Sequence, residues 1–167
     1  MSQPFIHRNR LHSPFFIFIQ AVGMYSDLEL LHHLDISRVA RDFAPSDTAK
    51  SVFVTQDPAW IHVADDWSYT LWHAPNTQAA IADLSIRHAI FTCCVGDIDL
   101  SYNFAYYRNA QLVRHCVVDS TLYGARSVVT NEGISLPCEA EAMRAHEGLD
   151  IVLSIAQFLG ITIHHNI

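Results

Sequence analysis

IFTCCVGDIDLSYNFAYYRNAQLVRHCVV, residues Ile90 to Val118, is the densest run of β-branched and aromatic residues in the chain. Such residues favour strands, because their side chains pack well on a pleated, half-buried surface. The run predicts a meander of three strands, Ala89–Val95, Ile98–Tyr107 and Gln111–Val118. It lies beyond the middle of the chain, where segments from both ends can pack on it.

The second of these strands shows a clear period of two. One face carries Ile98, Leu100, Tyr102, Phe104 and Tyr106, and smaller or more polar residues alternate with them. This alternation is typical of a half-buried strand. At the following turn Asn109 tolerates a positive φ, but Ala110 stands where a type I′ turn prefers glycine. A loop of three or four residues is therefore expected there.

The flanking segments predict further strands. Phe15–Val22 is apolar on both faces except at Gln20, as in a central strand that is covered on both sides. Shorter extended segments are expected at Ser51–Thr55, Ala59–Ala64 and Ser68–Trp72, and an edge strand at Tyr123–Thr130 before a turn at Asn131-Glu132-Gly133.

Helices are expected between these strands and at the end of the chain. Ser26-Asp27-Leu28-Glu29 has the spacing of a capping box and would begin a helix through His33, with a further helical stretch through Phe43. The later helices are expected at Gln78–Arg87, at Cys138–Ala145 with Glu139 and Glu141 in its first turn, and at Leu149–Leu159 before Gly160.

The fold class follows from these elements. A chain of 167 residues fits one domain. We predict a single α+β domain over residues 1–167, with a mainly antiparallel sheet of about five to seven strands and helices packed on it. Met1–Ser13 is expected to be a loose N-terminal arm.

Composition narrows the class of protein. Half of the residues are hydrophobic and 16% are charged, which argues against disorder. The net charge is −7, and nine arginines and one lysine form no basic stripe, so nucleic-acid binding is not expected. No window approaches the roughly 18 apolar residues that span a bilayer. No secretory signal pattern precedes the four cysteines, so a cytoplasmic protein with reduced thiols is expected.

A first candidate site is the acidic turn of the meander. Asp97 and Asp99 share a face of an extended segment, opposite Arg114 and His115 of the next predicted strand. Two carboxylates so placed can bind a metal or act as an acid/base pair. The structural alternative is a turn whose aspartates cap backbone amides, with Arg114 pairing one of them across the hairpin.

A second candidate site is WIHVADDWSYTLWH, Trp60–His73, which holds all three tryptophans. His62, one of the adjacent aspartates Asp65 and Asp66, and His73 could converge on a metal. Exposed tryptophan and tyrosine side chains could instead anchor a protein interface. The structural alternative is that these aromatic side chains belong to the core.

Neither candidate carries a recognised catalytic motif. The chain has no P-loop, GxGxxG, GxSxG or HExxH pattern, so neither a cofactor nor a catalytic residue is predicted. Three runs, DDWSYTLWH, DIDLSYNFAYYRNAQLVRHCVV and NEGISLPCEAE, resemble small stand-alone bacterial proteins, some of which are immunity proteins to polymorphic toxins. The resemblance covers Val52–Gly160. It implies a cytosolic single-domain protein that binds a toxin and blocks its active site, and it assigns no residue a role.

The first functional hypothesis is therefore a protein-binding module, most concretely an immunity protein with a basic toxin domain as its cognate partner. Its predicted partner-binding residues are Asp65, Asp66, Trp67, Asp97 and Asp99. The alternative is a metal-dependent or acid/base enzyme that uses a His/Asp cluster of His62, His73, Asp97 and Asp99. In a third possibility, a homo-oligomer forms through the sheet edge or the last helix.

Overall fold

The computed structural model describes residues 6–7, 15–20, 32, 34, 39–40, 52–56, 59–65, 70–96, 100–120 and 125–164. The predicted capping box Ser26–Glu29 lies outside them. So does most of the predicted arm Met1–Ser13, in which the structure describes only strand β1 (Ile6–His7). This strand pairs in parallel with β10 (Ile163–His164) near the other end of the chain.

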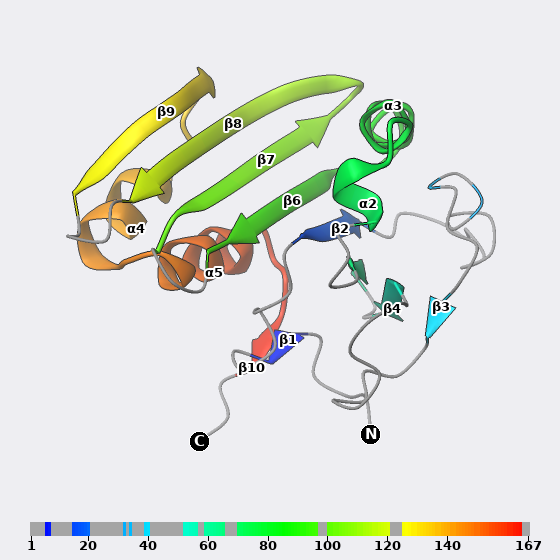
Figure 1. Ribbon diagram of the computed structural model, residues 1–167, viewed down its shortest axis with the longest axis horizontal. Coiled ribbons are helices and arrows are strands. Elements are labelled where there is room, and N and C mark those ends of the chain that lie inside the picture. The colour runs from blue at the N-terminus through cyan, green and yellow to red at the C-terminus, as the bar shows by residue number, and fades with distance from the viewer. Residues whose placement is uncertain are drawn as a thin grey trace.

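One twisted sheet of eight strands runs through the molecule (Figure 1). Across the sheet the order is β3 (Val39–Ala40), β4 (Val52–Gln56), β5 (Trp60–Ala64), β2 (Phe16–Gln20), β6 (Ile90–Val95), β7 (Tyr102–Arg108), β8 (Gln111–Ser120) and β9 (Arg126–Gly133). All neighbours are antiparallel except β3 and β4. The sheet has one strand more than the largest number expected, because β3 joins its edge.

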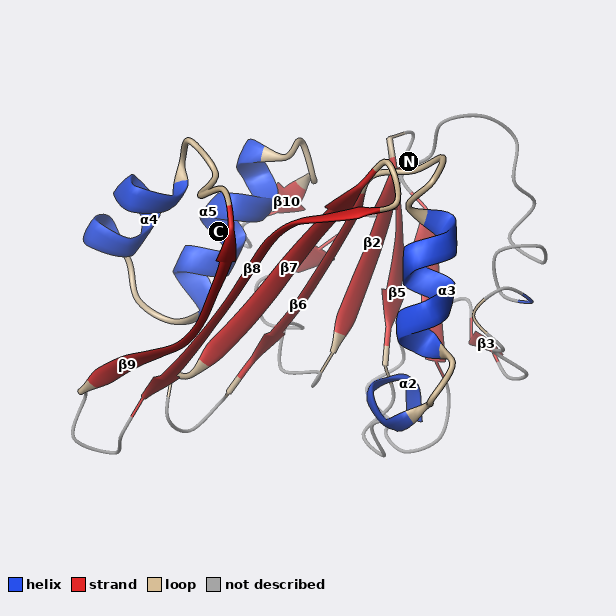
Figure 2. Ribbon diagram, turned by 90° about the horizontal axis from the view of Figure 1, so that it is seen from above, coloured by secondary structure: helices blue, strands red, loops and turns tan. Residues whose placement is uncertain are grey.

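Two pairs of helices pack on the sheet from opposite sides (Figure 2). One pair is α2 (Thr70–His73) and α3 (Thr77–Leu84), and the other is α4 (Glu139–Ala145) and α5 (Leu149–Phe158). The predicted α+β class, with helices packed on a mainly antiparallel sheet, is confirmed.

Strand β2 lies at the centre of two cores, as its two apolar faces predicted. Phe16 and Phe18 belong to the core on the α5 side of the sheet. Ile17 and Ile19 belong to the core that α3 closes on the other side. All four side chains are at most 2% exposed, so this strand is covered on both faces.

The conformation differs from the sequence prediction at three places. Val39–Ala40, predicted helical, forms β3 because it pairs in parallel with β4. Ser68–Trp72 was predicted to be extended, but its described part belongs to α2. The predicted turn at Asn131-Glu132-Gly133 is the end of β9, whose residues pair with Arg114–Cys116 of β8. In the two sheet segments, hydrogen bonds to a distant strand decide the conformation.

The β7–β8 hairpin turns more tightly than expected. Arg108 pairs with Gln111, and the two residues between them, Asn109 and Ala110, both have positive φ, 53° and 59°. The prediction of a longer loop was therefore wrong, because the geometry is that of a two-residue type I′ turn. The Ala110 N–H also donates to the Ser85 carbonyl oxygen, at 3.1 Å, which ties the turn to the end of α3.

Replacing Ala110 with glycine is expected to raise the free energy of unfolding by about 0.5–1 kcal/mol, because the steric cost of a left-handed alanine exceeds the entropy that glycine loses. The bond to Ser85 involves only the backbone and is retained in the variant. Urea denaturation of both proteins measures the difference. A less stable glycine variant would contradict the turn geometry.

Tyr102 of β7 gives a prediction for alkaline pH. It is 4% exposed, its ring stacks beside Phe104, and burial raises the pKa of its hydroxyl to about 12 from an ordinary value of 10. The folded state thus favours the neutral hydroxyl, so this stabilisation is complete below pH 10 and is lost as the pH rises toward 12. Tyr102→Phe should therefore lose less stability than the wild type between pH 10 and 12. Equal slopes of unfolding free energy against pH would contradict this.

Candidate functional site

Arg114 is a charged side chain in the core, 2% exposed, on the face of β8 that α4 covers. A buried guanidinium needs acceptors for its N–H groups. Nε donates to Oε2 of Glu139 at 2.8 Å, and Nη2 donates to Oε1 of the same carboxylate. Nη1 donates to the backbone oxygens of Glu132, at 2.9 Å, and His115, at 3.3 Å. Arg114 therefore joins β8, the edge strand β9 and α4.

Glu139 begins α4 and is itself 3% exposed. Its Oε2 also accepts from the Leu136 N–H at 3.1 Å, and its own N–H donates to the Leu136 oxygen at 2.9 Å. The backbone bond closes a turn from Leu136 to Glu139, and the Leu136 N–H fixes the carboxylate where it meets Arg114. The hydrogen bond to Glu139 raises the pKa of Arg114 above its ordinary value. The bidentate pair is a structural clamp between helix and sheet.

This clamp corrects two interpretations of the sequence. Arg114 was expected to pair with Asp97 or Asp99 across the hairpin, but it pairs with Glu139. Glu139 was expected only as an acidic residue in the first turn of its helix, where the helix dipole favours a negative charge. Arg114, Cys116 and Val118 are every second residue of β8 and so lie on one face of the strand. This spacing does indicate an inward-facing cation that needs a buried partner.

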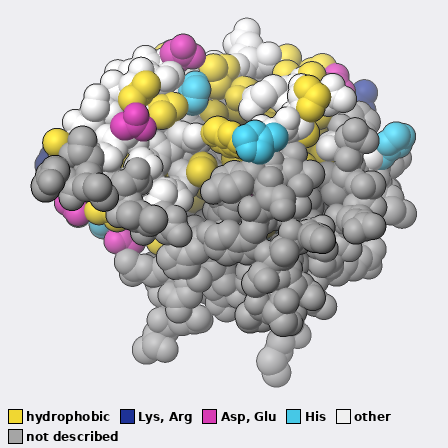
Figure 3. Space-filling model, viewed as in Figure 1, with side chains coloured by type: hydrophobic (Ala, Val, Ile, Leu, Met, Phe, Trp, Pro, Cys, Tyr) yellow, Lys and Arg dark blue, Asp and Glu magenta, His cyan; other side chains and the backbone are white. Residues whose placement is uncertain are grey.

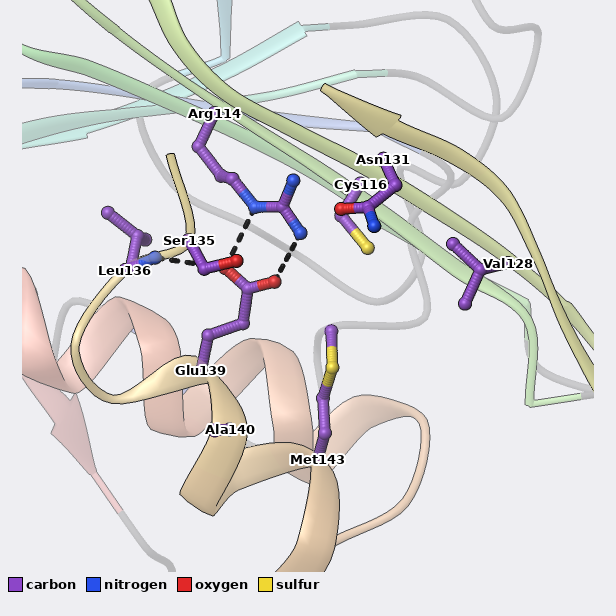
Figure 4. A pocket seen from close by; sticks show the side chains of 9 residues that line it. All are labelled: Arg114, Cys116, Val128, Asn131, Ser135, Leu136, Glu139, Ala140 and Met143. Atoms are coloured by element: carbon purple, nitrogen blue, oxygen red, sulfur yellow. Dashed lines mark hydrogen bonds and ion pairs between the residues drawn. The ribbon is translucent and has the colours of Figure 1, made fainter. Parts of the chain in front are cut away.

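A cavity of about 240 Å³ lies beside the clamp, between β9 and α4 (Figure 4). Val128 and Asn131 of β9 line it on one side, and Ala140 and Met143 of α4 line it on the other. Arg114, Cys116, Ser135, Leu136 and Glu139 complete its lining. The cavity therefore combines apolar side chains with amide, hydroxyl and guanidinium groups.

An irregularity in β9 shapes this cavity. Val118 of β8 pairs with Val128, but the preceding Val117 pairs with Thr130, so Val129 is an extra residue. Such a β-bulge changes which side chains share a face. Val128 and Asn131, three positions apart, thus both line the cavity.

Strand β9 forms the edge of the sheet, and no described strand pairs with its outer side. Val128 and Val129 are 58% and 60% exposed, and Ile134 just beyond the strand is 82% exposed. An edge strand presents backbone N–H and C=O groups that can pair with another chain. Backbone groups, exposed apolar side chains and a cavity therefore occur together along β9.

The charges around this edge are mainly acidic. From Gln111 to Gly148 the sequence has five acidic residues and three arginines, and the buried Arg114–Glu139 pair neutralises itself. The remaining acidic residues are Asp119, Glu132, Glu141 and Glu147, and the remaining arginines are Arg126 and Arg144. Arg126 forms an ion pair with Glu147 at 3.0 Å.

On the face of the sheet opposite α4, no described helix covers β8 and β9 (Figure 2). Near the end of β7, Tyr107 packs against the core that α3 closes, and its hydroxyl donates to Oε1 of Gln78 at 3.4 Å. Apolar, acidic and histidine side chains mix over the described surface in Figure 3, with arginine only near its margins. A shallow hollow of about 100 Å³, lined by Cys94, Asn103 and Asp119 among others, lies at the ends of β6 and β7. Gly96 and Ser101, which flank the predicted acidic turn, also line this hollow.

Asp65 is the one described member of the predicted partner-binding set, and it is 2% exposed. Its Oδ1 accepts from the Leu71 N–H at 2.9 Å, and its Oδ2 accepts from the Trp72 N–H at 3.0 Å. The carboxylate therefore anchors α2 and presents little surface to a partner. Asp66, Trp67, Asp97 and Asp99 lie outside the described residues and stay predictions.

The tryptophans of the aromatic stretch have different environments. Trp60 is 2% exposed and belongs to the core on the α5 side. Trp72 is 46% exposed and packs edge-on against Phe15, with 5.3 Å between ring centroids. Trp72 is therefore the described aromatic of this stretch that a partner can contact.

The histidines of the enzyme hypothesis do not come together. His62 stacks on Phe16 and Phe18, at centroid distances of 5.2 and 4.6 Å, on the α5 side of the sheet. His73 ends α2, which packs on the opposite side through Leu71. Within the described ranges, no three His, Cys, Asp or Glu residues are grouped as metal ligands.

Comparisons with known proteins add no assignment to this geometry. No protein-family model, curated protein or solved structure matches the chain. Among the described helices, none has the length and apolar character needed to cross a membrane.

Proposed function

We propose that this chain is a protein-binding module, most concretely a cytosolic immunity protein that binds a cognate bacterial toxin domain and blocks its active site. The observation that carries the proposal is the β9 edge, where exposed Val128 and Val129 accompany backbone groups that no described strand pairs. Isolated exposed apolar residues are common, but several along a sheet edge favour association with another chain.

The charge of the chain supports a basic partner. The net charge is −7, and acidic residues outnumber arginines around β9. Complementary charge speeds the encounter of two proteins and excludes wrong partners. A toxin domain with a basic active-site surface, as nucleic-acid-cleaving proteins have, is the kind of partner that fits.

The predicted residues Asp66, Trp67, Asp97 and Asp99 form the second part of the proposed binding surface. Exposed Trp72 lies close in sequence to Asp66 and Trp67 and can serve as an aromatic anchor. Trp67→Ala and a paired Asp97→Asn, Asp99→Asn variant are expected to weaken the binding of the partner. Unchanged affinity in both variants would remove this region from the proposal.

Co-expression with the product of the adjacent gene tests the function. If that product is a toxin, its expression should arrest growth alone and should be tolerated when this chain is present. Purified chain should then bind the purified product, as measured by calorimetry. Equal growth arrest with and without this chain, together with no binding, would refute the immunity function.

A further inference from the structure

We infer that an extended segment of a basic partner protein adds to the sheet along β9 and inserts one side chain into the cavity between β9 and α4. This inference rests on the proposed protein-binding function and specifies how the partner is held. Strand addition is a recurrent mode of recognition in which backbone bonds supply affinity and side-chain pockets supply specificity.

The backbone of β9 determines the shape of the partner segment. β9 spans eight residues, Arg126–Gly133, and pairs on one side with β8. Its outward N–H and C=O groups can pair with another extended chain that follows the twist of the strand. The backbone groups of a helix bond within the helix, so a helix packed on this edge would leave the N–H and C=O groups of β9 unpaired. An extended segment is therefore the occupant that fits.

The cavity accounts for selection of a side chain. At about 240 Å³ it is smaller than the roughly 300–1,000 Å³ typical of sites for whole small molecules, but it has room for one large side chain. Val128, Ala140 and Met143 would contact the apolar stem of that side chain. Asn131 and Ser135 offer hydrogen-bonding groups to its tip. Every second side chain of an added strand would point to the face of the sheet that α4 covers, where the cavity lies.

The bulge at Val129 favours a different protein over a second copy of the chain. Bulges twist an edge strand away from regular pairing and are a common protection against self-association. Two copies paired through β9 would place both bulges in the same short ladder. A flexible segment without a bulge of its own can follow the twist of β9.

The charges beside the edge indicate what flanks the inserted side chain. Glu132 on β9 and Glu141 on α4 are exposed, and Glu147 is 72% exposed although it pairs with Arg126. Basic residues on both sides of the inserted side chain would therefore be attracted to the site. A β-branched segment with lysine or arginine at its ends matches both the backbone and the charge of the edge.

Amide hydrogen exchange of the full chain tests the inference with two probes. One probe is the product of the adjacent gene, and the other is the acetylated peptide KTVLVTK, with KTVPVTK as its control. Each active probe should slow exchange in β9, and the peptide should leave β4, near the other edge, unchanged. The proline peptide should protect β9 much less, because it lacks an N–H and resists central pairing.

Two matched variants test the cavity. Ala140 is exposed on α4 and lines the cavity, whereas Ala145 is exposed on the same helix and does not line it. Ala140→Phe should fill the cavity and weaken the binding of the probes about tenfold, while Ala145→Phe should leave it unchanged. Thermal unfolding of both variants establishes that they are folded.

The outcomes separate this inference from the immunity function. Binding of the gene product without protection of β9, or with equal effects of the two alanine variants, would overturn the inference and leave the immunity function standing. Protection of β9 by the peptide alone would refute the immunity function and support the site. A stable dimer of the free chain that buries β9 would also overturn the inference, as would the absence of protection by either probe.

Discussion

Replacing Glu139 with alanine is expected to lower the free energy of unfolding by about 3–5 kcal/mol, since it leaves the buried guanidinium of Arg114 without its partner. Arg114 is 2% exposed, and among the described residues it keeps two backbone acceptors in the variant. The Leu136 N–H also loses its acceptor. Urea denaturation measures this loss directly, provided that the slope of unfolding free energy against urea concentration is the same in both proteins.

Two controls show whether the loss comes from the buried charge. Glu141→Ala, on the exposed side of the same helix turn, should change stability by no more than about 0.5 kcal/mol. The double variant Arg114→Met, Glu139→Leu should recover most of the stability, because an apolar pair of similar volume leaves no unpaired charge. A Glu139→Ala variant within about 1 kcal/mol of the wild type would contradict the clamp.

Phe91→Ala is expected to lower the free energy of unfolding by about 3–5 kcal/mol, and Ile90→Ala by about 2–5 kcal/mol. These neighbours on β6 are both 0% exposed and point to opposite faces of the sheet. Phe91 packs against Phe18 and Phe104, at centroid distances of 6.1 and 6.2 Å. Ile90 belongs to the core that α3 closes.

The pair of variants tests whether helices really cover both faces of the central strands. Val129→Ala is a suitable control, because this side chain is 60% exposed and its loss should cost little. If one of the two core variants lost less than about 1 kcal/mol, the corresponding face of β6 would not be packed as described.

The parts of the fold that were predictable have strong local patterns. The alternation in β7 identified Tyr102 and Phe104 as inward-facing, and both are in the core. The apolar run of β2 identified a strand covered on both sides. For α5, the broad apolar face and Gly160, which has a φ of 84°, located the helix and its end.

The parts that were not predictable depend on specific contacts that local propensity does not encode. The short helix α2 is held by Asp65, six and seven residues before the amides that it binds. Ala110 adopts a positive φ where its N–H meets the oxygen of Ser85, 25 residues earlier in the chain. β3 and the end of β9 exist because neighbouring strands pair with them. Local propensity contains no information on these contacts.

The candidate site could not be predicted from the sequence for the same reason. The alternation of β8 could indicate that Arg114 faces inward, but it could not identify Glu139, 25 residues away, as its partner. The cavity requires the bulge at Val129, which appears only when the registers of β8 and β9 are compared. The acidic turn and the aromatic stretch were chosen for their composition, but composition does not determine whether a side chain lies in the core or on the surface.

The affinity of the adjacent gene's product for Val129→Lys most directly tests whether the β9 edge is the binding surface. A lysine on an edge strand opposes pairing with another chain, so binding should weaken at least about tenfold. Ile86→Lys is the matched control, because Ile86 is 56% exposed and follows α3 on the other side of the sheet. Full affinity in the Ile86 variant and weakened affinity in the Val129 variant are the predicted result. Equal affinity of the two variants would contradict binding through β9.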